Sequence, residues 1–165
     1  MTHDFVSSSK IGAIGESIIY EYLCDMPNVQ EVIDVRKDKH YQEVDIDYIL
    51  IMQDGHERTV EVKTDSYVSP NLFFETMSSL ESNSIGCMYK TQATWLLYYF
   101  LTTKELYVLK MPDFRDWVDE NIKRFEKKRI KNWRYDRVRK YTTEGRLIPK
   151  VILEEEFTSF KKIML

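Results

Sequence analysis

The stretch EVDIDYILIMQDGHERTVEVKTD, residues 43–65, decides the fold of this chain. Its two arms, 44–53 and 57–65, are rich in β-branched and aliphatic residues, as strands are. Between them stands the dipeptide Asp54-Gly55, which favours the tight turn of a β-hairpin. The sequence therefore predicts an antiparallel hairpin, and its two arms also carry charges that an apolar strand does not need.

Four charged side chains of this hairpin are expected to gather on one face. Because side chains alternate along a strand, Asp45 and Asp47 share a face of the first arm, and Glu61 and Lys63 share a face of the second. The turn folds Asp47 back toward Glu61 when the register brings both charged faces together. Carboxylates so close repel each other, and a divalent cation such as Mg²⁺ or Mn²⁺ relieves the repulsion. The alternative is an ordinary solvated strand face.

The rest of the chain alternates between helical and strand patterns. We expect a helix at 8–25, strands at 29–36 and 71–79, a loop at 37–42, a helical turn at 90–94, a second hairpin from 93–101 and 106–111, a helix after Pro112, a strand at 146–153 and a terminal helix at 154–165. Helix, then sheet, then helix predicts a small α/β or α+β fold. The length of 165 residues predicts a single domain, 1–165.

Positive charge is concentrated in one segment, 121–141. Between residues 123 and 140 ten Lys and Arg face two acidic residues, a net charge of +8, whereas the remaining residues carry −11. Such a segment can contact the phosphates of DNA, and Trp133 and Tyr135 within it can stack on bases. The alternative is a solvated helix face that extends or follows the helix after Pro112. The candidate DNA-binding residues are Lys90, Lys127, Lys128, Arg129, Lys131, Arg134, Arg137 and Arg139.

Other features narrow the class of protein. Cys24 and Cys87 lie far apart and form no metal-binding spacing, so reduced thiols are expected. The N-terminus has no signal-peptide pattern, and the longest apolar run, 95–101, is far shorter than the ~20 residues of a membrane span. No phosphate-binding loop or dinucleotide fingerprint occurs. We therefore expect a soluble cytoplasmic protein without a membrane partner.

The hairpin resembles the active-site motif of the PD-(D/E)XK nuclease superfamily. Asp47 precedes Glu61 by fourteen positions, and the run Val-Glu-Val-Lys ends in Lys63. Over residues 8–110 the chain is similar to small phage-type members and to Holliday junction resolvases. The resemblance implies a restriction-endonuclease-like core, a mixed central sheet flanked by helices. It also implies a metal held by Asp47, Glu61 and the Val62 carbonyl, and a catalytic Lys63.

The same resemblance implies a further glutamate on the first helix. Glu16 fits, since it follows the spacing of an inward-tending stripe with Gly12, Ile19, Tyr20 and Leu23. The alternative is an ordinary surface glutamate.

The chain departs from the family pattern at Ile46, where the name of the family places proline. Asp47 is the preferred metal ligand because an apolar strand follows it directly. Asp45, one pleat period away, stays open as a second or alternative ligand.

These observations together predict a Mg²⁺-dependent deoxyribonuclease, an endonuclease acting on the DNA backbone, with Mn²⁺ able to substitute. Whether it is structure-specific, and whether it forms a homodimer as a resolvase does, is left open. The alternative is a nucleic-acid-binding or assembly module that keeps the nuclease fold without catalysis. Weaker candidates for the border of the site are Asp65, Glu75, Lys90 and Gln92.

Overall fold

The computed structural model describes residues 3–133 and 140–165 of the chain. It divides into two compact units that are assembled from interleaved segments. Unit 1 comprises Met1–Lys10, Ser69–Lys90 and Asp113–Thr158, and unit 2 comprises Ile11–Val68, Thr91–Pro112 and Ser159–Leu165. Each unit has its own sheet, and the predicted α+β class is confirmed. The expectation of a single domain stays a prediction.

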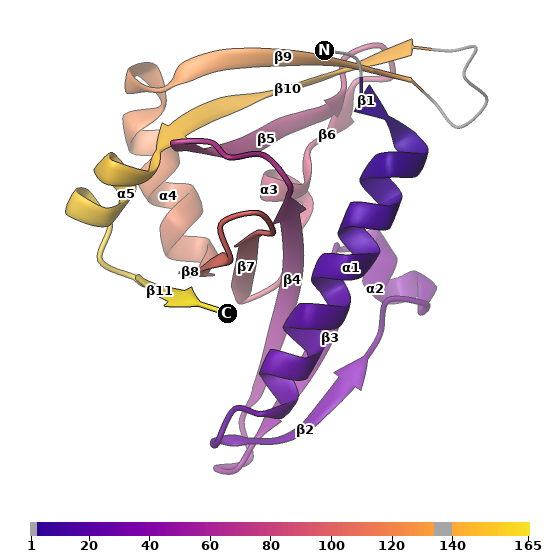
Figure 1. Ribbon diagram of the computed structural model, residues 1–165, viewed down its shortest axis with the longest axis vertical. Helices are drawn as coiled ribbons and strands as arrows, with labels where there is room; N and C mark the ends of the chain where they lie inside the picture. The colour runs from indigo at the N-terminus through magenta and orange to yellow at the C-terminus, as the bar shows by residue number, and fades with distance from the viewer. Residues whose placement is uncertain (1–2, 134–139) are drawn as a thin grey trace. The chain divides into compact units, whose positions relative to one another are not determined.

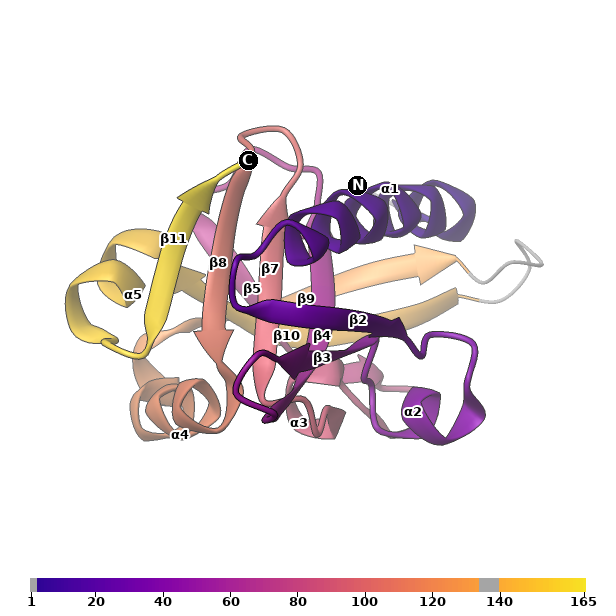
Figure 2. The same ribbon diagram turned by 90° about the horizontal axis from the view of Figure 1, so that it is seen from below.

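Unit 2 is built on a six-stranded sheet with the strand order β11-β8-β7-β4-β3-β2 (Figure 1). The strands are β2 (Val29–Asp34), β3 (Tyr48–Met52), β4 (Glu57–Asp65), β7 (Trp95–Phe100), β8 (Glu105–Lys110) and β11 (Phe160–Met164). β4 and β7 run parallel, whereas the other neighbours are antiparallel. The predicted mixed sheet is therefore confirmed, and Figure 2 shows β7, β8 and β11 side by side.

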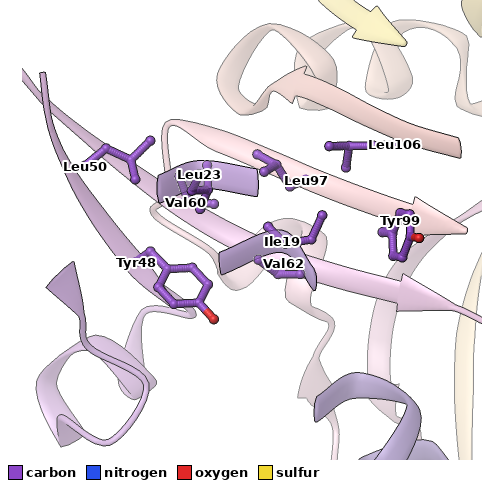
Figure 3. Packing of buried hydrophobic residues seen from close by; sticks show 9 residues of the cluster. All are labelled: Ile19, Leu23, Tyr48, Leu50, Val60, Val62, Leu97, Tyr99 and Leu106. Carbon is purple, nitrogen blue, oxygen red and sulfur yellow. The ribbon is translucent and has the colours of Figure 1, made fainter. Parts of the chain in front are cut away.

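The helix α1 (Phe5–Cys24) covers one face of this sheet with its later turns. Ile19 and Leu23, one helical turn apart, pack against apolar side chains from four strands (Figure 3). These partners are Tyr48, Leu50, Val60, Val62, Leu97, Tyr99 and Leu106. Burial of each large aliphatic side chain contributes about 1.5–3 kcal/mol, so this cluster is what holds α1 on the sheet.

One position of α1 approaches the sheet very closely. A Cβ added at Gly15 would lie 1.9 Å from Thr64 Oγ1 and 2.7 Å from Thr64 Cβ. Only glycine therefore permits this distance between α1 and β4. The close approach brings the next residue, Glu16, to the end of the hairpin where Asp47 lies.

Unit 1 is built on a five-stranded sheet with the order β1-β9-β10-β5-β6. Its strands are β1 (His3–Asp4), β5 (Asn71–Ser79), β6 (Ser84–Ile85), β9 (Glu126–Trp133) and β10 (Lys140–Pro149). Four short helical segments belong wholly or mainly to this unit: α3 (Cys87–Lys90), α4 (Met111–Asn121), the 3-10 turn η1 (Ile122–Arg124) and α5 (Lys150–Glu156). Figure 1 shows β9, β10 and β5 running side by side.

The core of unit 1 is aromatic. Phe74 on β5 contacts Tyr89 and Phe114 with ring centroids 5.4 Å and 5.6 Å apart, at steep angles. Phe114 also contacts Phe157, and Trp117 lies against both of these rings. Edge-on contacts of this kind add to the free energy of burial. A separate core of this kind explains why unit 1 is compact by itself.

The C-terminal prediction was right only for residues 146–149, which lie in β10, and 154–156, which lie in α5. We expected a strand at 146–153 and a helix at 154–165, but β10 ends at Pro149, α5 spans Lys150–Glu156 and the last segment is β11. β11 pairs along the edge of β8, and Phe160 stacks on Tyr107. Hydrogen bonding to an open sheet edge thus outweighs the local helical pattern.

Two other local predictions need correction. The loop expected at 37–42 contains the helix α2 (Lys39–Glu43), which begins where the Asp38 side chain accepts a hydrogen bond from the backbone N–H of His40. The helical turn expected at 90–94 lies earlier, in α3. The predicted hairpins are confirmed, with Gly55 at a φ of 82° in the first turn.

Candidate active site

The register of the first hairpin brings Asp47 and Glu61 together. Tyr48 pairs with Val60, so the residue before Tyr48 lies opposite the residue after Val60. The backbone N–H of Asp47 donates to the Val60 carbonyl at 2.8 Å, and Asp47 Oδ2 accepts from the Val62 N–H at 2.8 Å. The predicted convergence is confirmed, and the Asp47 carboxyl is fixed against β4.

The Asp47 and Glu61 carboxyl groups lie close enough for each to change the pKa of the other. Burial raises the pKa of Asp47 to about 6, and the charge of Glu16 raises it as well. Burial also raises the pKa of Glu61 well above its ordinary value, with further increases from Asp47 and Asp45. Two carboxyls in contact titrate as a pair, so this pair retains a proton more readily than a solvated carboxylate does.

Lys63 lies two residues beyond Glu61 on β4, on the same face of the strand. Its charge lowers the pKa of Glu61, which places the ammonium near that carboxyl. The structure thus brings together the three hairpin residues that the sequence singled out, Asp47, Glu61 and Lys63.

Asp45 reaches the site by a different route from the one predicted. It does not continue the pleat of β3, because its φ is 45°, in the left-handed region, and β3 begins only at Tyr48. Its carbonyl accepts a hydrogen bond from Thr91 Oγ1 at 2.6 Å. The assignment of Asp45 to the same strand face was wrong. Its carboxylate nevertheless lies close enough to raise the pKa of Glu61.

Glu16 lies beside this pair and is held by a residue that sequence reasoning missed. Arg36 Nη1 donates to Glu16 Oε2 at 2.5 Å, and the two side chains are 31% and 30% exposed. The other guanidinium nitrogens of Arg36 bind Asp34. No motif in the sequence marks Arg36, since its link to Glu16 spans twenty residues and depends on the packing of α1.

The donor set of this site fits Mg²⁺ or Mn²⁺ in part. Among the described residues there is no group of three or more His, Cys, Asp or Glu side chains arranged to hold a metal ion. Mg²⁺ commonly binds one or two carboxylates and completes its shell with water and substrate oxygens. Asp47 and Glu61 supply two such carboxyls, whereas one oxygen of Glu16 is engaged by Arg36. A metal role for Val62 through its carbonyl stays a prediction.

In the described part of the basic segment, residues 126–133 form the strand β9, whereas the alternative interpretation was a helix. β9 pairs with β10 over eight residue pairs, from Lys140 opposite Trp133 to Leu147 opposite Glu126. Pairing with β10, a segment later in the chain, makes these residues a strand. The local pattern of charges does not contain this information. The interpretation of a solvated helix face was therefore wrong.

Two of the predicted DNA-binding cations of β9 are already paired. Lys127 Nζ lies 3.1 Å from Glu144 Oε1, and Arg129 Nε lies 2.7 Å from Glu144 Oε2. Lys128 and Lys131 are exposed on β9. Lys140 lies over the Trp133 ring at 4.4 Å.

Arg134, Arg137 and Arg139 lie outside the described residues, as does Tyr135. Lys90, which is exposed at the end of α3, belongs to unit 1 and not to the unit that contains the carboxyl pair.

The weaker candidates Glu75, Gln92 and Asp65 have other hydrogen-bond partners. Glu75, in unit 1, accepts a hydrogen bond from the Cys87 N–H at 3.2 Å. Gln92, in unit 2, donates its backbone N–H to the Val44 carbonyl at 2.9 Å. Asp65, at the end of β4, accepts a hydrogen bond from the Tyr67 N–H at 2.8 Å. None of these contacts involves the carboxyl pair.

No family model matches the chain, and comparisons with curated proteins and with solved structures found no match. In the described part of the chain, no helix is long and apolar enough to span a membrane. The resemblance to PD-(D/E)XK nucleases therefore rests on the residues of the hairpin and stays a proposal.

Proposed function

We propose that this chain is a Mg²⁺-dependent DNA phosphodiesterase of the PD-(D/E)XK type. The observation that carries the proposal is the hairpin register, which places Asp47 opposite Glu61 on the strand that also carries Lys63. Carboxyls with raised pKa values beside a lysine are typical of sites that do chemistry. A solvated strand face would not fix Asp47 by a hydrogen bond from the neighbouring strand.

Each residue has a distinct task in this proposal. Asp47 and Glu61 would hold the ion. A bound divalent cation would neutralise the charge of these carboxylates and of the phosphate. The Lys63 ammonium would donate a hydrogen bond to the attacking water or to a phosphate oxygen. The Val62 N–H keeps the Asp47 carboxyl in place through its 2.8 Å bond. In-line attack would then form a P–O bond from the water oxygen and break the P–O bond to the leaving sugar oxygen, which takes up a proton as the water loses one to solvent.

We propose that β9 supplies contacts to the DNA backbone. Lys128 and Lys131 are exposed, and Arg129 is 61% exposed even though it pairs with Glu144. Contacts between such cations and phosphates release counterions, so binding should weaken steeply as salt rises and should depend little on base sequence.

The test is cleavage of a labelled panel of supercoiled plasmid, linear duplex, single strand, flap and four-way junction. Wild-type protein is compared with Glu61→Gln in the presence of Mg²⁺, Mn²⁺ or EDTA. Glu57→Gln is the matched control, since Glu57 is an exposed glutamate on the same strand. We expect metal-dependent cleavage by wild type and by the Glu57 variant, and none by the Glu61 variant. Equal cleavage by all three proteins would contradict the proposal.

The cationic surface of β9 favours one second function, a nucleic-acid-binding module without catalysis. In that case none of the three proteins cuts DNA, while wild type and Glu61→Gln bind it equally and with the same salt dependence.

Preferred cutting of the four-way junction by wild type would point to a resolvase. That preference predicts a homodimer, which sedimentation of the protein would detect.

A further inference from the structure

Arg36 is anchored at the end of β2 by a single carboxylate. Its Nε donates to Asp34 Oδ1 at 2.9 Å, and its Nη2 donates to Asp34 Oδ2 at 2.6 Å. The backbone N–H of Arg36 also donates to Asp34 Oδ1, at 3.1 Å. A two-pronged pair of this kind fixes the plane of the guanidinium, which a single contact cannot do.

The remaining guanidinium nitrogen donates to Glu16, the first-helix glutamate that the resemblance to PD-(D/E)XK nucleases implies as a further site residue. Arg36 Nη1 donates to Glu16 Oε2 at 2.5 Å, and about two thirds of each side chain is shielded from solvent. With Nε, Nη1 and Nη2 all bonded to the two carboxylates of Asp34 and Glu16, the guanidinium is committed to protein contacts. This arrangement is suited to orienting the Glu16 carboxylate.

The same cluster is connected to Asp47 through the main chain and through Tyr48. The N–H of Val35, the residue before Arg36, donates to the Asp47 carbonyl at 3.0 Å. The Tyr48 hydroxyl donates to the Glu16 carbonyl at 3.2 Å, and the Arg36 guanidinium lies 5.1 Å from the centre of the Tyr48 ring. Hydrogen bonds to main-chain carbonyls therefore connect the segment before Arg36 to Asp47, and Glu16 to Tyr48.

We propose that Arg36 is a positioning residue that holds the Glu16 carboxylate in a fixed place beside the Asp47 and Glu61 pair. This inference rests on the proposed nuclease function, in which Glu16 assists the two hairpin carboxyls. Groups that orient the ligands of a metal site commonly change metal affinity or activity 10–100-fold when they are removed. The role requires the fork of arginine, because lysine offers one point charge and cannot bind Asp34 and Glu16 in the same plane.

A purely structural ion pair makes a different prediction. Arg36 joins α1 to the end of β2, so its loss could weaken the fold alone. In that case the folded fraction falls while turnover per folded molecule is unchanged. A positioning role instead lowers kcat through Glu16 and leaves the KM for DNA unchanged, because in this proposal Arg36 acts on Glu16 and not on the substrate.

The experiment compares wild type with Arg36→Gln, Arg36→Lys, Glu16→Gln and the double variant Arg36→Gln/Glu16→Gln. The control is Arg58→Gln, since Arg58 is an exposed arginine on β4. Circular dichroism establishes the folded fraction, cleavage of the best substrate of the panel gives kcat and KM, and calorimetry gives the affinity for Mn²⁺ without DNA. If Arg36→Gln does not fold, Arg36→Lys, which keeps the charge, is read in its place.

We expect Arg36→Gln and Arg36→Lys to lower kcat about 10–100-fold with KM within about twofold, and to weaken Mn²⁺ binding in the same range. The double variant should be no slower than Glu16→Gln, because Arg36 acts only through Glu16. Wild-type turnover in either Arg36 variant, or independent losses in the double variant, would overturn the inference while the nuclease function stands. A wild type that neither cuts DNA nor binds Mn²⁺ would overturn both.

Discussion

Substitution of Gly15 by alanine tests how closely α1 lies on the sheet. The added Cβ would lie 1.9 Å from Oγ1, 2.6 Å from Cγ2 and 2.7 Å from Cβ of Thr64. Rotation of the Thr64 side chain does not move the Thr64 Cβ, so it cannot relieve the 2.7 Å contact between this atom and the added Cβ. The backbone of α1 or β4 must therefore move, and the core of Ile19 and Leu23 moves with it.

The magnitude follows from two opposing effects. Overpacking a core costs about 1–3 kcal/mol, and three contacts shorter than 3.0 Å place Gly15→Ala at the upper end of this range. Replacement of a helical glycine by alanine returns about 1 kcal/mol. The net loss in the free energy of unfolding is thus about 2 kcal/mol. With a urea slope of about 2 kcal/mol per molar, the midpoint should fall by about 1 M.

Two further variants complete this test in urea unfolding followed by circular dichroism. Gly12→Ala is the control, because its added Cβ would lie 3.9 Å from Glu16 Oε1, an ordinary contact, and it should stabilise the protein by up to about 1 kcal/mol. Thr64→Ala in the Gly15→Ala background removes two of the three short contacts and should recover about 1 kcal/mol. Equal stability of the Gly15 and Gly12 variants would refute the close approach.

Three other perturbations have expected outcomes. The pKa of Asp47 is raised from 3.8 to about 6, so the folded state binds a proton more tightly than the unfolded state, and this contribution to stability is lost as pH rises from about 4 to about 6. Asp47→Asn should flatten that part of the stability curve in urea unfolding at a series of pH values. The pKa of Glu81 is lowered from 4.5 to about 2 by hydrogen bonds from Thr142, so its contribution is present above about pH 4.5 and lost as pH falls to about 2. Glu81→Gln should therefore lower the free energy of unfolding above about pH 4.5 and reduce its fall between about pH 4.5 and 2, whereas an unchanged pH dependence would contradict the assignment. Glu144→Gln releases Lys127 and Arg129 and should strengthen DNA binding and steepen its salt dependence in fluorescence anisotropy, with no change expected if these cations do not meet phosphate.

The hairpin could be predicted because its information is local. Asp54-Gly55 sets the turn, and the turn sets the register that pairs Tyr48 with Val60. Once that register holds, Asp47 must lie beside Glu61. The position of Asp45 could not be predicted in this way, because side chains alternate only within a strand. Asp45 precedes the strand and has a positive φ.

Features that depend on distant segments could not be predicted in the same way. β11 has the composition of an amphipathic helix, and only the open edge of β8 makes it a strand. The division into two units likewise results from segments that leave a unit and return to it, such as Ser69–Lys90 and Asp113–Thr158. Arg36 belongs to this class too, because its partner Glu16 is brought near by the packing of α1.

Gly15 and Glu16 show how the stability of unit 2 and its site are linked. Gly15 sets the distance of α1 from β4, and Glu16, the next residue, is directed by Arg36. These two constraints are independent, since one is steric and the other is electrostatic. If α1 is displaced by Gly15→Ala, the Arg36 bond can hold the Glu16 carboxylate only by pulling on Asp34 and β2. A variant that weakens the fold at Gly15 should therefore also lower turnover per folded molecule, and Thr64→Ala should recover part of both losses together.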